Sequence, residues 1–142
     1  MIISTRGRYA LRVMIDLAEH TNEHYIPMKA VAERQHISLK YLEKILPSLA
    51  KNNFIVGVHG KGGGYKLTKK PEEYKIGDII RATEGDIVSV ACLDCKAEKC
   101  ENEENCRTRP MWGHLQDIVN TYLDSITIAD LMKDEGLLHP SK

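Results

Sequence analysis

The sequence predicts a mainly α-helical protein that also contains one small β-hairpin. Three observations support this fold class. Apolar residues recur at steps of three and four over several separate stretches, which is the spacing of amphipathic helices. A glycine-rich stretch, residues 59–64, lies between two short β-type runs and is typical of a hairpin tip. One long apolar face follows a polar segment that holds all four cysteines of the chain.

The length and charge of the chain limit what it can be. Its 142 residues correspond to about one domain. The net charge is zero, but residues 1–81 carry +6 and residues 82–142 carry −6. A basic half indicates a polyanionic partner such as nucleic acid, although scattered surface charge is the alternative. The beginning of the sequence has no signal-peptide core, and no apolar run approaches the span of a bilayer, so we expect a cytoplasmic protein without a membrane partner.

Three helices are expected in the first fifty residues. The first covers residues 5–19, a polar break covers residues 21–24, and the second begins at Pro27, a residue favoured at the first helical position. Ser38 is a suitable N-cap for the third helix, because its hydroxyl can accept a hydrogen bond from an unpaired backbone N–H. The side chains expected to face inward are Ala10, Val13, Met14, Leu17, Ala18, Val31, Ala32, Leu39, Leu42, Ile45, Leu46 and Leu49.

The third helix has a polar outer face and an internal proline. Lys40, Tyr41, Glu43 and Lys44 are left on the outer side. Pro47 lacks a backbone N–H and its ring clashes with the preceding turn, so we expect a kink or an early end there. Two short helices joined by a tight turn, the second with a polar outer face, match a helix-turn-helix.

The hairpin is expected directly after the helix-turn-helix. Residues 54–58 and 65–68 predict its strands, and His59 and Lys61 lie in its glycine-rich tip, where the backbone can come close to a partner. A phosphate-binding loop is the alternative, but its spacing and its following Ser or Thr are missing. A hairpin in this place is typical of a wing that meets DNA, which makes the predicted fold a winged helix-turn-helix domain.

Residues 76–83 predict a fourth helix, and residues 111–126 predict a long amphipathic helix. The small domain before it cannot cover so long an apolar face, so we expect a second copy of the helix to bury it in a homodimer. Packing back onto its own chain is the alternative. Thr127 is expected to cap a last short helix that Gly136 ends. The face consists of Met111, Trp112, Leu115, Ile118, Val119, Tyr122, Leu123 and Ile126.

The four cysteines, Cys92, Cys95, Cys100 and Cys106, lie within fifteen residues that are otherwise mostly charged or polar. This stretch has no apolar periodicity and is expected to be a loop kept for its thiols. In a reducing compartment such a group is more typical of metal ligands or redox groups than of disulfides. An iron–sulfur cluster, a zinc ion and thiol oxidation are all compatible with these residues.

An enzyme is not expected. A thiol oxidoreductase could use Cys92 and Cys95, but this pair does not follow a strand in an alternating βαβ pattern. The predicted organisation has three parts. A winged helix-turn-helix DNA-binding domain covers residues 1–84, a cysteine-containing sensor loop covers residues 85–107, and the dimerisation helix and C-terminal helix cover residues 108–142.

The motifs together resemble the Rrf2 family of winged helix-turn-helix transcriptional regulators, which includes the IscR, NsrR and CymR types. The resemblance covers essentially the whole chain in order. It implies a homodimeric repressor that binds a two-fold DNA operator, with third helices in major grooves and wings toward minor grooves. The matching stretches are TRGRYALRVMIDLA, ISLKYLEKIL, GVHGKGGGYKL, IGDIIRATEG, the cysteine loop and PMW…YLDSITIADL.

By position, the resemblance implies DNA contacts from the third helix and the wing. Lysine can contact phosphate or guanine acceptors, and Glu can accept from cytosine N4. His59 stands where similar wings often have Arg, which predicts weaker or pH-sensitive binding. The implied DNA-binding residues are Ser38, Lys40, Tyr41, Glu43, Lys44, His59 and Lys61.

Many members of the family carry an iron–sulfur cluster, either 2Fe–2S or 4Fe–4S, on three cysteines of the loop. The resemblance implies Cys92, Cys100 and Cys106 as ligands, with Cys95 as an extra or substitute ligand. Two positions that supply a fourth ligand in some relatives hold Arg109 and Arg8 here, so the fourth ligand stays open. The implied signal is iron–sulfur, redox or nitrosative status. The alternative is a regulator without a cluster, controlled by zinc, thiol oxidation, a metabolite or a partner protein.

Overall fold

The structure is a computed structural model and describes residues 3–20 and 24–133. It is mainly helical with a two-stranded antiparallel hairpin, which confirms the predicted fold class. Gly136 and residues 21–23 of the expected polar break lie outside the described residues. The elements are α1 (Thr5–Glu19), α2 (Met28–Gln35), α3 (Leu39–Lys51), β1 (Ile55–Val58), β2 (Gly64–Leu67), the 3₁₀ turn η1 (Pro71–Glu73), α4 (Ile76–Glu84), the 3₁₀ turns η2 (Ala91–Leu93) and η3 (Glu103–Asn105), α5 (Arg109–Ser125) and α6 (Ile128–Lys133).

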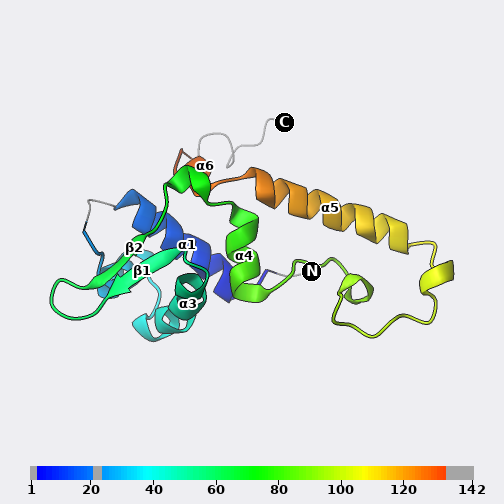
Figure 1. Ribbon diagram of the computed structural model, residues 1–142, viewed down its shortest axis with the longest axis horizontal. Coiled ribbons are helices and arrows are strands. Elements are labelled where there is room, and N and C mark those ends of the chain that lie inside the picture. The colour runs from blue at the N-terminus through cyan, green and yellow to red at the C-terminus, as the bar shows by residue number, and fades with distance from the viewer. Residues whose placement is uncertain (1–2, 21–23, 134–142) are drawn as a thin grey trace.

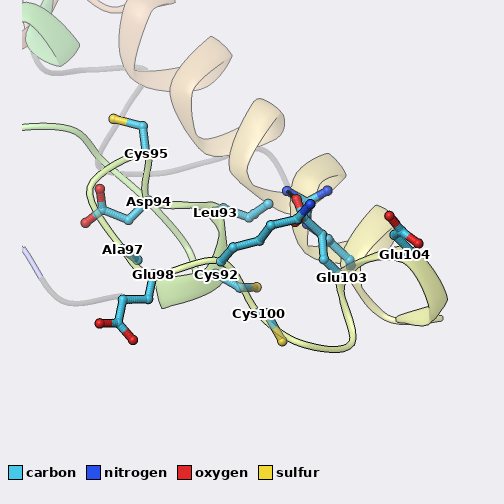
Figure 2. A pocket seen from close by; sticks show the side chains of 11 residues that line it. Cys92, Leu93, Asp94, Cys95, Ala97, Glu98, Cys100, Glu103 and Glu104 are labelled. Atoms are coloured by element: carbon cyan, nitrogen blue, oxygen red, sulfur yellow. Dashed lines mark ion pairs between the residues drawn. The ribbon is translucent and has the colours of Figure 1, made fainter.

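The elements form a compact body with one projecting arm (Figure 1). The body contains α1 to α4, the hairpin and α6. The arm consists of α5 and the loop that leads to it from α4, which Figure 2 shows from close by. The hairpin tip lies at the end of the molecule opposite the arm, so the hairpin tip and the cysteine loop are far apart.

The hairpin is joined to the segment before α2. Ile55 pairs with Leu67 and Val58 with Gly64 across the two strands. Ile26 adds a bridge to Tyr65, with N–H to carbonyl distances of 2.8 and 2.9 Å. Gly64 has a φ of +151°, and a Cβ there would collide with the backbone of Ile26. Only glycine therefore allows this close pairing, which sets the direction of the wing.

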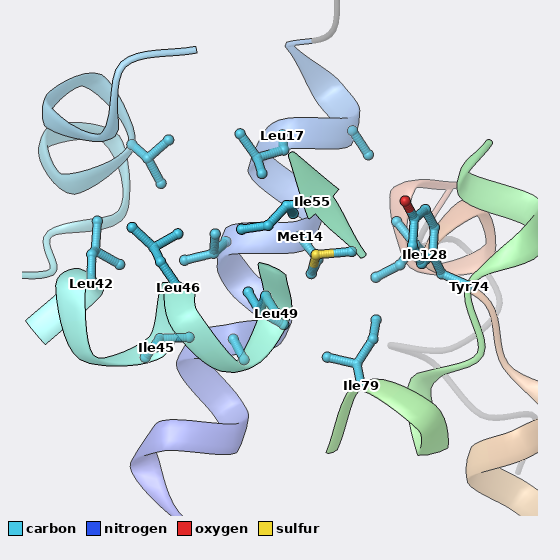
Figure 3. Packing of buried hydrophobic residues seen from close by; sticks show 14 of the residues in the cluster. Met14, Leu17, Leu42, Ile45, Leu46, Leu49, Ile55, Tyr74, Ile79 and Ile128 are labelled. Atoms are coloured by element: carbon cyan, nitrogen blue, oxygen red, sulfur yellow. The ribbon is translucent and has the colours of Figure 1, made fainter. Parts of the chain in front are cut away.

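A single apolar core holds α3 against α1 and the hairpin (Figure 3). Tyr74 is buried in it, yet its hydroxyl is fully satisfied, since it donates to Phe54 O at 2.8 Å and accepts from the backbone N–H groups of Thr68 and Lys69. Through these bonds Tyr74, which lies just before α4, holds the outer ends of both strands in place. The largest fully buried side chains are Tyr74, Met14, Leu17, Leu42, Ile45, Leu49, Ile79, Ile128, Val13, Val31 and Asp16.

Three local expectations are wrong. Leu39 was expected in the core but is 42% exposed, because it lies on the same face of α3 as the exposed Glu43, whereas Leu42 of the same turn is fully buried. Of the kink or early end expected at Pro47, the early end is wrong: α3 continues for four more residues, since Pro47 itself is exposed and the buried Leu49 holds the last turn in place. Pro27 is the N-cap of α2 and not its first residue, which shifts the start by one position.

Two caps are confirmed. The Ser38 hydroxyl accepts from the backbone N–H of Tyr41 at 3.1 Å. The Thr127 hydroxyl accepts from the backbone N–H of Asp130 at 3.2 Å, and the Asp130 carboxylate accepts in return from the N–H of Thr127. The starts of α3 and α6 are therefore each fixed by residues of their own sequence.

Asp16 is a fully buried carboxylate between α1 and α2. Arg34 donates to both of its oxygens, at 2.7 and 3.1 Å, and Gln35 Nε2 donates at 2.9 Å. Burial raises the pKa of Asp16, but the hydrogen bonds from Arg34 and Gln35 more than offset this effect, so the pKa lies below its ordinary value of 3.8. The network ties α2 to α1 and so holds the first helix of the helix-turn-helix against the body.

Replacing Asp16 by Asn removes the charge but keeps the side-chain shape. Because Arg34 is partly exposed and can turn to water, we expect the free energy of unfolding to fall by about 1–3 kcal/mol at neutral pH. The depressed pKa means that the carboxylate stabilises the fold above its unfolded pKa of about 3.9 and loses this effect as the pH falls below that value. Urea denaturation at several pH values should show the gap between wild type and Asp16→Asn closing toward acid.

The matched control for this test is Glu33→Gln, which neutralises an exposed carboxylate on α2. It should leave the free energy of unfolding nearly unchanged at every pH. A constant gap for Asp16→Asn between neutral and acid pH would show that the charge of Asp16 does not stabilise the helix pair.

Candidate nucleic-acid interface and sensor loop

The outer face of α3 is polar and open to solvent. Ser38, Lys40, Glu43 and Lys44 are all exposed on it. Arg6 from the start of α1 donates to the carbonyl of Lys44 at 3.3 Å and to the Ser48 hydroxyl at 3.2 Å. The middle of α3 is thus held by α1, while its polar side chains remain free to meet a ligand.

Tyr41 differs from its neighbours on this face. It was expected on the exposed side, but it is half-buried because its ring packs edge-to-face against Tyr9 of α1, with centroids 5.4 Å apart. The guanidinium of Arg12 lies 5.1 Å from the centre of the Tyr9 ring. Tyr41 therefore packs α3 on α1 and is not a free side chain of the outer face.

The hairpin tip carries two exposed polar residues, His59 and Lys61. They alternate with Gly60 and Gly62, whose φ angles are +99° and +78°. Lys66, farther down the hairpin, lies with its ammonium 4.8 Å from the centre of the Tyr25 ring and so packs against the body. Lys66 is therefore held against the body, whereas His59 and Lys61 are exposed at the tip of the hairpin.

The cysteine loop connects α4 to α5. All four of its cysteines are free; Cys92 and Cys106 are half-buried, and Cys95 and Cys100 are exposed. Figure 2 shows the thiols of Cys92 and Cys100 on the same side of the loop, whereas Cys95 points away from both. A cavity of about 730 Å³ is lined by Cys92, Cys95 and Cys100, and Cys106 lines a neighbouring cavity of about 360 Å³.

Arg109 lines both cavities of the loop. Its Nη2 donates to Glu103 at 2.8 Å, while its Nε is buried without a hydrogen-bond acceptor. Thr108 supplies a hydroxyl 3.4 Å from the Cys106 sulfur. This hydroxyl and the backbone N–H groups of Thr108 and Arg109 lower the pKa of the Cys106 thiol, which favours the thiolate form that binds metals.

The donor chemistry of the loop fits a group held by thiolates. An unpaired N–H beside a cysteine of lowered pKa is suited to an anionic occupant, and a thiolate-held iron–sulfur cluster is of that kind. Across residues 3–20 and 24–133, however, no three Cys, His, Asp or Glu side chains come close enough together to hold a metal ion. The residues therefore fit the group in chemistry, although their thiols do not converge on one point.

The apolar face of α5 is divided between two environments. Val119 and Leu123 pack against the core of the body. Met111, Leu115, Ile118 and Tyr122 are between 39% and 57% exposed, and a groove of about 470 Å³ runs beside Ile118 and Tyr122. Packing onto its own chain therefore covers one side of the face and leaves a continuous stripe, Met111, Leu115, Ile118 and Tyr122, uncovered. In the described part of the chain, no helix is both long and apolar enough to cross a membrane.

Comparison with known proteins identifies the family. The model of the family described as "Rrf2: Iron-dependent Transcriptional regulator" matches residues 3–134. The chain belongs to the Rrf2 family. It is 35% identical over 138 residues to the HTH-type transcriptional regulator IscR of Serratia proteamaculans, covering 97% of this chain and 83% of that protein.

Solved structures agree with this assignment of family and fold. The structure of CymR (YrzC), the global cysteine regulator of B. subtilis, has a TM-score of 0.79 and 35% identity, with 94% of this chain and 97% of that chain covered. T. potens IscR has a TM-score of 0.74 and 32% identity, with 100% and 93% covered. The chain is therefore an Rrf2 transcriptional regulator with a winged helix-turn-helix fold, and its relatives are named as regulators, not as enzymes.

In this Rrf2 regulator, the start of the cysteine loop, residues 87–89, is hydrogen-bonded to α5. Ser89 donates its backbone N–H to Gln116 at 3.1 Å and its hydroxyl to the Trp112 carbonyl at 3.1 Å. Asn120 Nδ2 donates to the carbonyl of Ile87 at 3.2 Å. These bonds join the start of the loop directly to the long helix.

Two charged residues in the last turn of α4 link α5 to the start of α1. Arg81 donates to Asp124 at 2.8 Å and to Asn120 at 2.7 Å, and the hydrogen bond with Asp124 raises the pKa of Arg81. Glu84 accepts from the backbone N–H groups of Ser4, at 2.6 Å, and Gly7, at 3.2 Å, and so caps the start of α1. A Cβ on Gly7 would meet this carboxylate.

Sequence reasoning missed both residues. Arg81 lies within the stretch that predicts the fourth helix and Glu84 directly after it, but their partners lie about forty and eighty positions away in the chain. Nothing in the local sequence indicates such pairings. For Glu84 alone there is a distant signal at the start of α1, which has no acidic residue of its own in its first turn.

Replacing Ile118 by Lys places a charge in the middle of the exposed stripe on α5. If a second copy covers this stripe, the charge must be buried without a partner, so we expect dimer affinity to fall by roughly 3 kcal/mol, on the order of a hundred-fold. Ile118 is 55% exposed, so each chain should stay folded by circular dichroism. Sedimentation should show monomers for Ile118→Lys and dimers for the control Ile118→Leu, whereas a dimeric Ile118→Lys would place the interface elsewhere.

Proposed function

We propose that this Rrf2 regulator is a homodimeric repressor of a two-fold DNA operator, and that an iron–sulfur cluster on the cysteine loop sets its affinity for DNA. One observation carries the proposal. The loop that holds four free thiols is hydrogen-bonded to α5 through Ser89, and α5 is joined through Arg81 to the helix that caps α1. Sensor, dimer helix and reader therefore belong to one connected network.

The proposed reader is the first half of α3 together with the wing tip. Residues at the start of a recognition helix contact base edges in the major groove. Glu43 is suited to accept from cytosine N4, and the lysines are suited to phosphate or guanine. Tyr41 keeps a part in this proposal through its hydroxyl, while its ring packs against Tyr9. The proposed contacts are Ser38, Lys40, Tyr41, Glu43, Lys44, His59 and Lys61.

The proposed dimer contact is the uncovered stripe of α5. Four large apolar side chains along one helix are costly to leave in water, and a second copy of the helix is an economical cover for them. A two-fold dimer presents two copies of α3, so the preferred operator should be two-fold, with half-sites about one DNA turn (~34–36 Å) or a multiple apart.

The proposed cluster ligands are Cys92, Cys100 and Cys106. Cys95 is left as an extra thiol, in keeping with its direction away from Cys92 and Cys100. Arg109 cannot ligate, but its unpaired Nε is suited to donate to an anionic group in the cavity. When bound, such a cluster, 2Fe–2S or 4Fe–4S, supplies a redox-active centre whose state reports iron–sulfur, redox or nitrosative status.

A second candidate is a regulator without a cluster, in which thiol oxidation, zinc, a metabolite or a partner protein supplies the signal. One observation favours thiol chemistry, since the neighbours of Cys106 lower the pKa of its thiol. The similarity to a global cysteine regulator, at 35% identity, favours a signal linked to cysteine supply. A low-pKa thiol is the form that oxidants attack, so the same loop could act through its sulfur alone.

The two candidates predict different behaviour for the four single Cys→Ala variants purified without oxygen. A missing ligand removes a thiolate outright, so we expect Cys92→Ala, Cys100→Ala and Cys106→Ala to lose most bound iron, sulfide and visible absorbance. Cys95→Ala is the matched control and should keep most of all three. Equal losses in all four variants would indicate a four-cysteine site. Wild-type protein that carries zinc or no metal would instead support the second candidate.

A further inference from the structure

Leu39 is the one large hydrophobic residue of α3 that is exposed, and the core does not explain its presence. It is 42% exposed, whereas Leu42, Ile45, Leu46 and Leu49 on the same helix are at most 4% exposed. Its exposed neighbours on α3 are the polar residues Lys40, Glu43 and Lys44. An apolar side chain therefore stands within an otherwise polar surface, in the first turn of the helix.

The place of Leu39 within α3 determines what it can meet. It follows the capping residue Ser38 directly, and residues at this end of a recognition helix reach base edges in the major groove. Residues four apart on a helix lie on one face, so Leu39 and Glu43 share a face. Every base pair presents donors and acceptors in that groove, but only thymine presents a methyl group, at its C5 position.

We propose that Leu39 determines sequence specificity by packing against a thymine methyl group in each half-site. The proposal rests on the proposed function, since it needs α3 in the major groove. Four residues of helix span about 6 Å, and base pairs are about 3.4 Å apart. The thymine should therefore lie about two base pairs from the cytosine that we assign to Glu43.

The test replaces the methyl group and the leucine separately and then together. A preferred duplex is first selected from random sequences with wild-type protein. Each thymine of one half-site is then replaced by deoxyuridine, which lacks only the C5 methyl group. Removing one buried methyl group should weaken wild-type binding by about four-fold at one position and leave the others nearly unchanged.

The variant Leu39→Ala should bind the thymine and deoxyuridine duplexes equally, because the partner of the methyl group is gone. Leu39→Met keeps an apolar side chain and should retain most of the discrimination, and Leu39→Asn, of similar size but polar, should lose it. Since Leu39 is partly exposed, all three variants should melt close to wild type. If Leu39→Ala weakened binding to every duplex by the same factor, Leu39 would have a structural role, and the proposal would be overturned.

The remaining outcomes separate this inference from the function on which it rests. A preferred duplex whose binding is indifferent to every deoxyuridine replacement would overturn the role of Leu39 and leave the DNA-binding proposal intact. Failure to select any preferred duplex would overturn both.

Discussion

The last turn of α4 holds the interaction on which both halves of the molecule depend. Glu84 accepts from the backbone at the start of α1, and Arg81 pairs with Asp124 on α5. α1 in turn holds α3 through Arg6 and the ring of Tyr9. Contacts therefore run from α5 through the last turn of α4 and through α1 to the recognition helix. This junction adds charged contacts to the apolar packing of Val119 and Leu123, which also joins α5 to the body.

A charged junction is well suited to a switch. An ion pair between partly exposed groups contributes little net stability, so it can be broken and remade at small cost. The fully buried residues of the core and the Asp16 network lie outside α5 and hold the helices of the body together, while α5 adds the half-buried Val119 and Leu123 to this packing. The proposed control of affinity requires a weak contact of this kind beside a well-packed DNA-binding domain.

The fold could be predicted largely because its signals are local. The inward residues of α1 and α3, the glycine-rich hairpin tip and the Ser38 cap follow from spacing and from backbone chemistry within a few residues. Leu39 could not be separated from the core, since it falls in step with Leu42 and Leu46 and only tertiary packing leaves it outside. The early end expected at Pro47 was wrong for a related reason, because burial of Leu49 holds the helix together beyond it.

The candidate site could be predicted in part. The cysteines and the polar residues of α3 are visible in the sequence, but the direction of each thiol is not, and the division of the α5 face depends on which side the body covers. The pairs Arg81–Asp124 and Glu84–Ser4 join distant parts of the chain and leave no local pattern. Long-range contacts made by charged side chains are therefore what could not be predicted from the sequence alone.

The most direct test of the connection between loop and reader is the DNA affinity of one protein preparation in two states. Wild-type protein purified without oxygen would be measured on its preferred duplex by fluorescence anisotropy before and after chelation removes its iron. If the loop sets the affinity through α4 and α5, the dissociation constants should differ by about 5- to 150-fold, the usual range for coupled sites. Equal dissociation constants, with iron present only before chelation, would contradict the account.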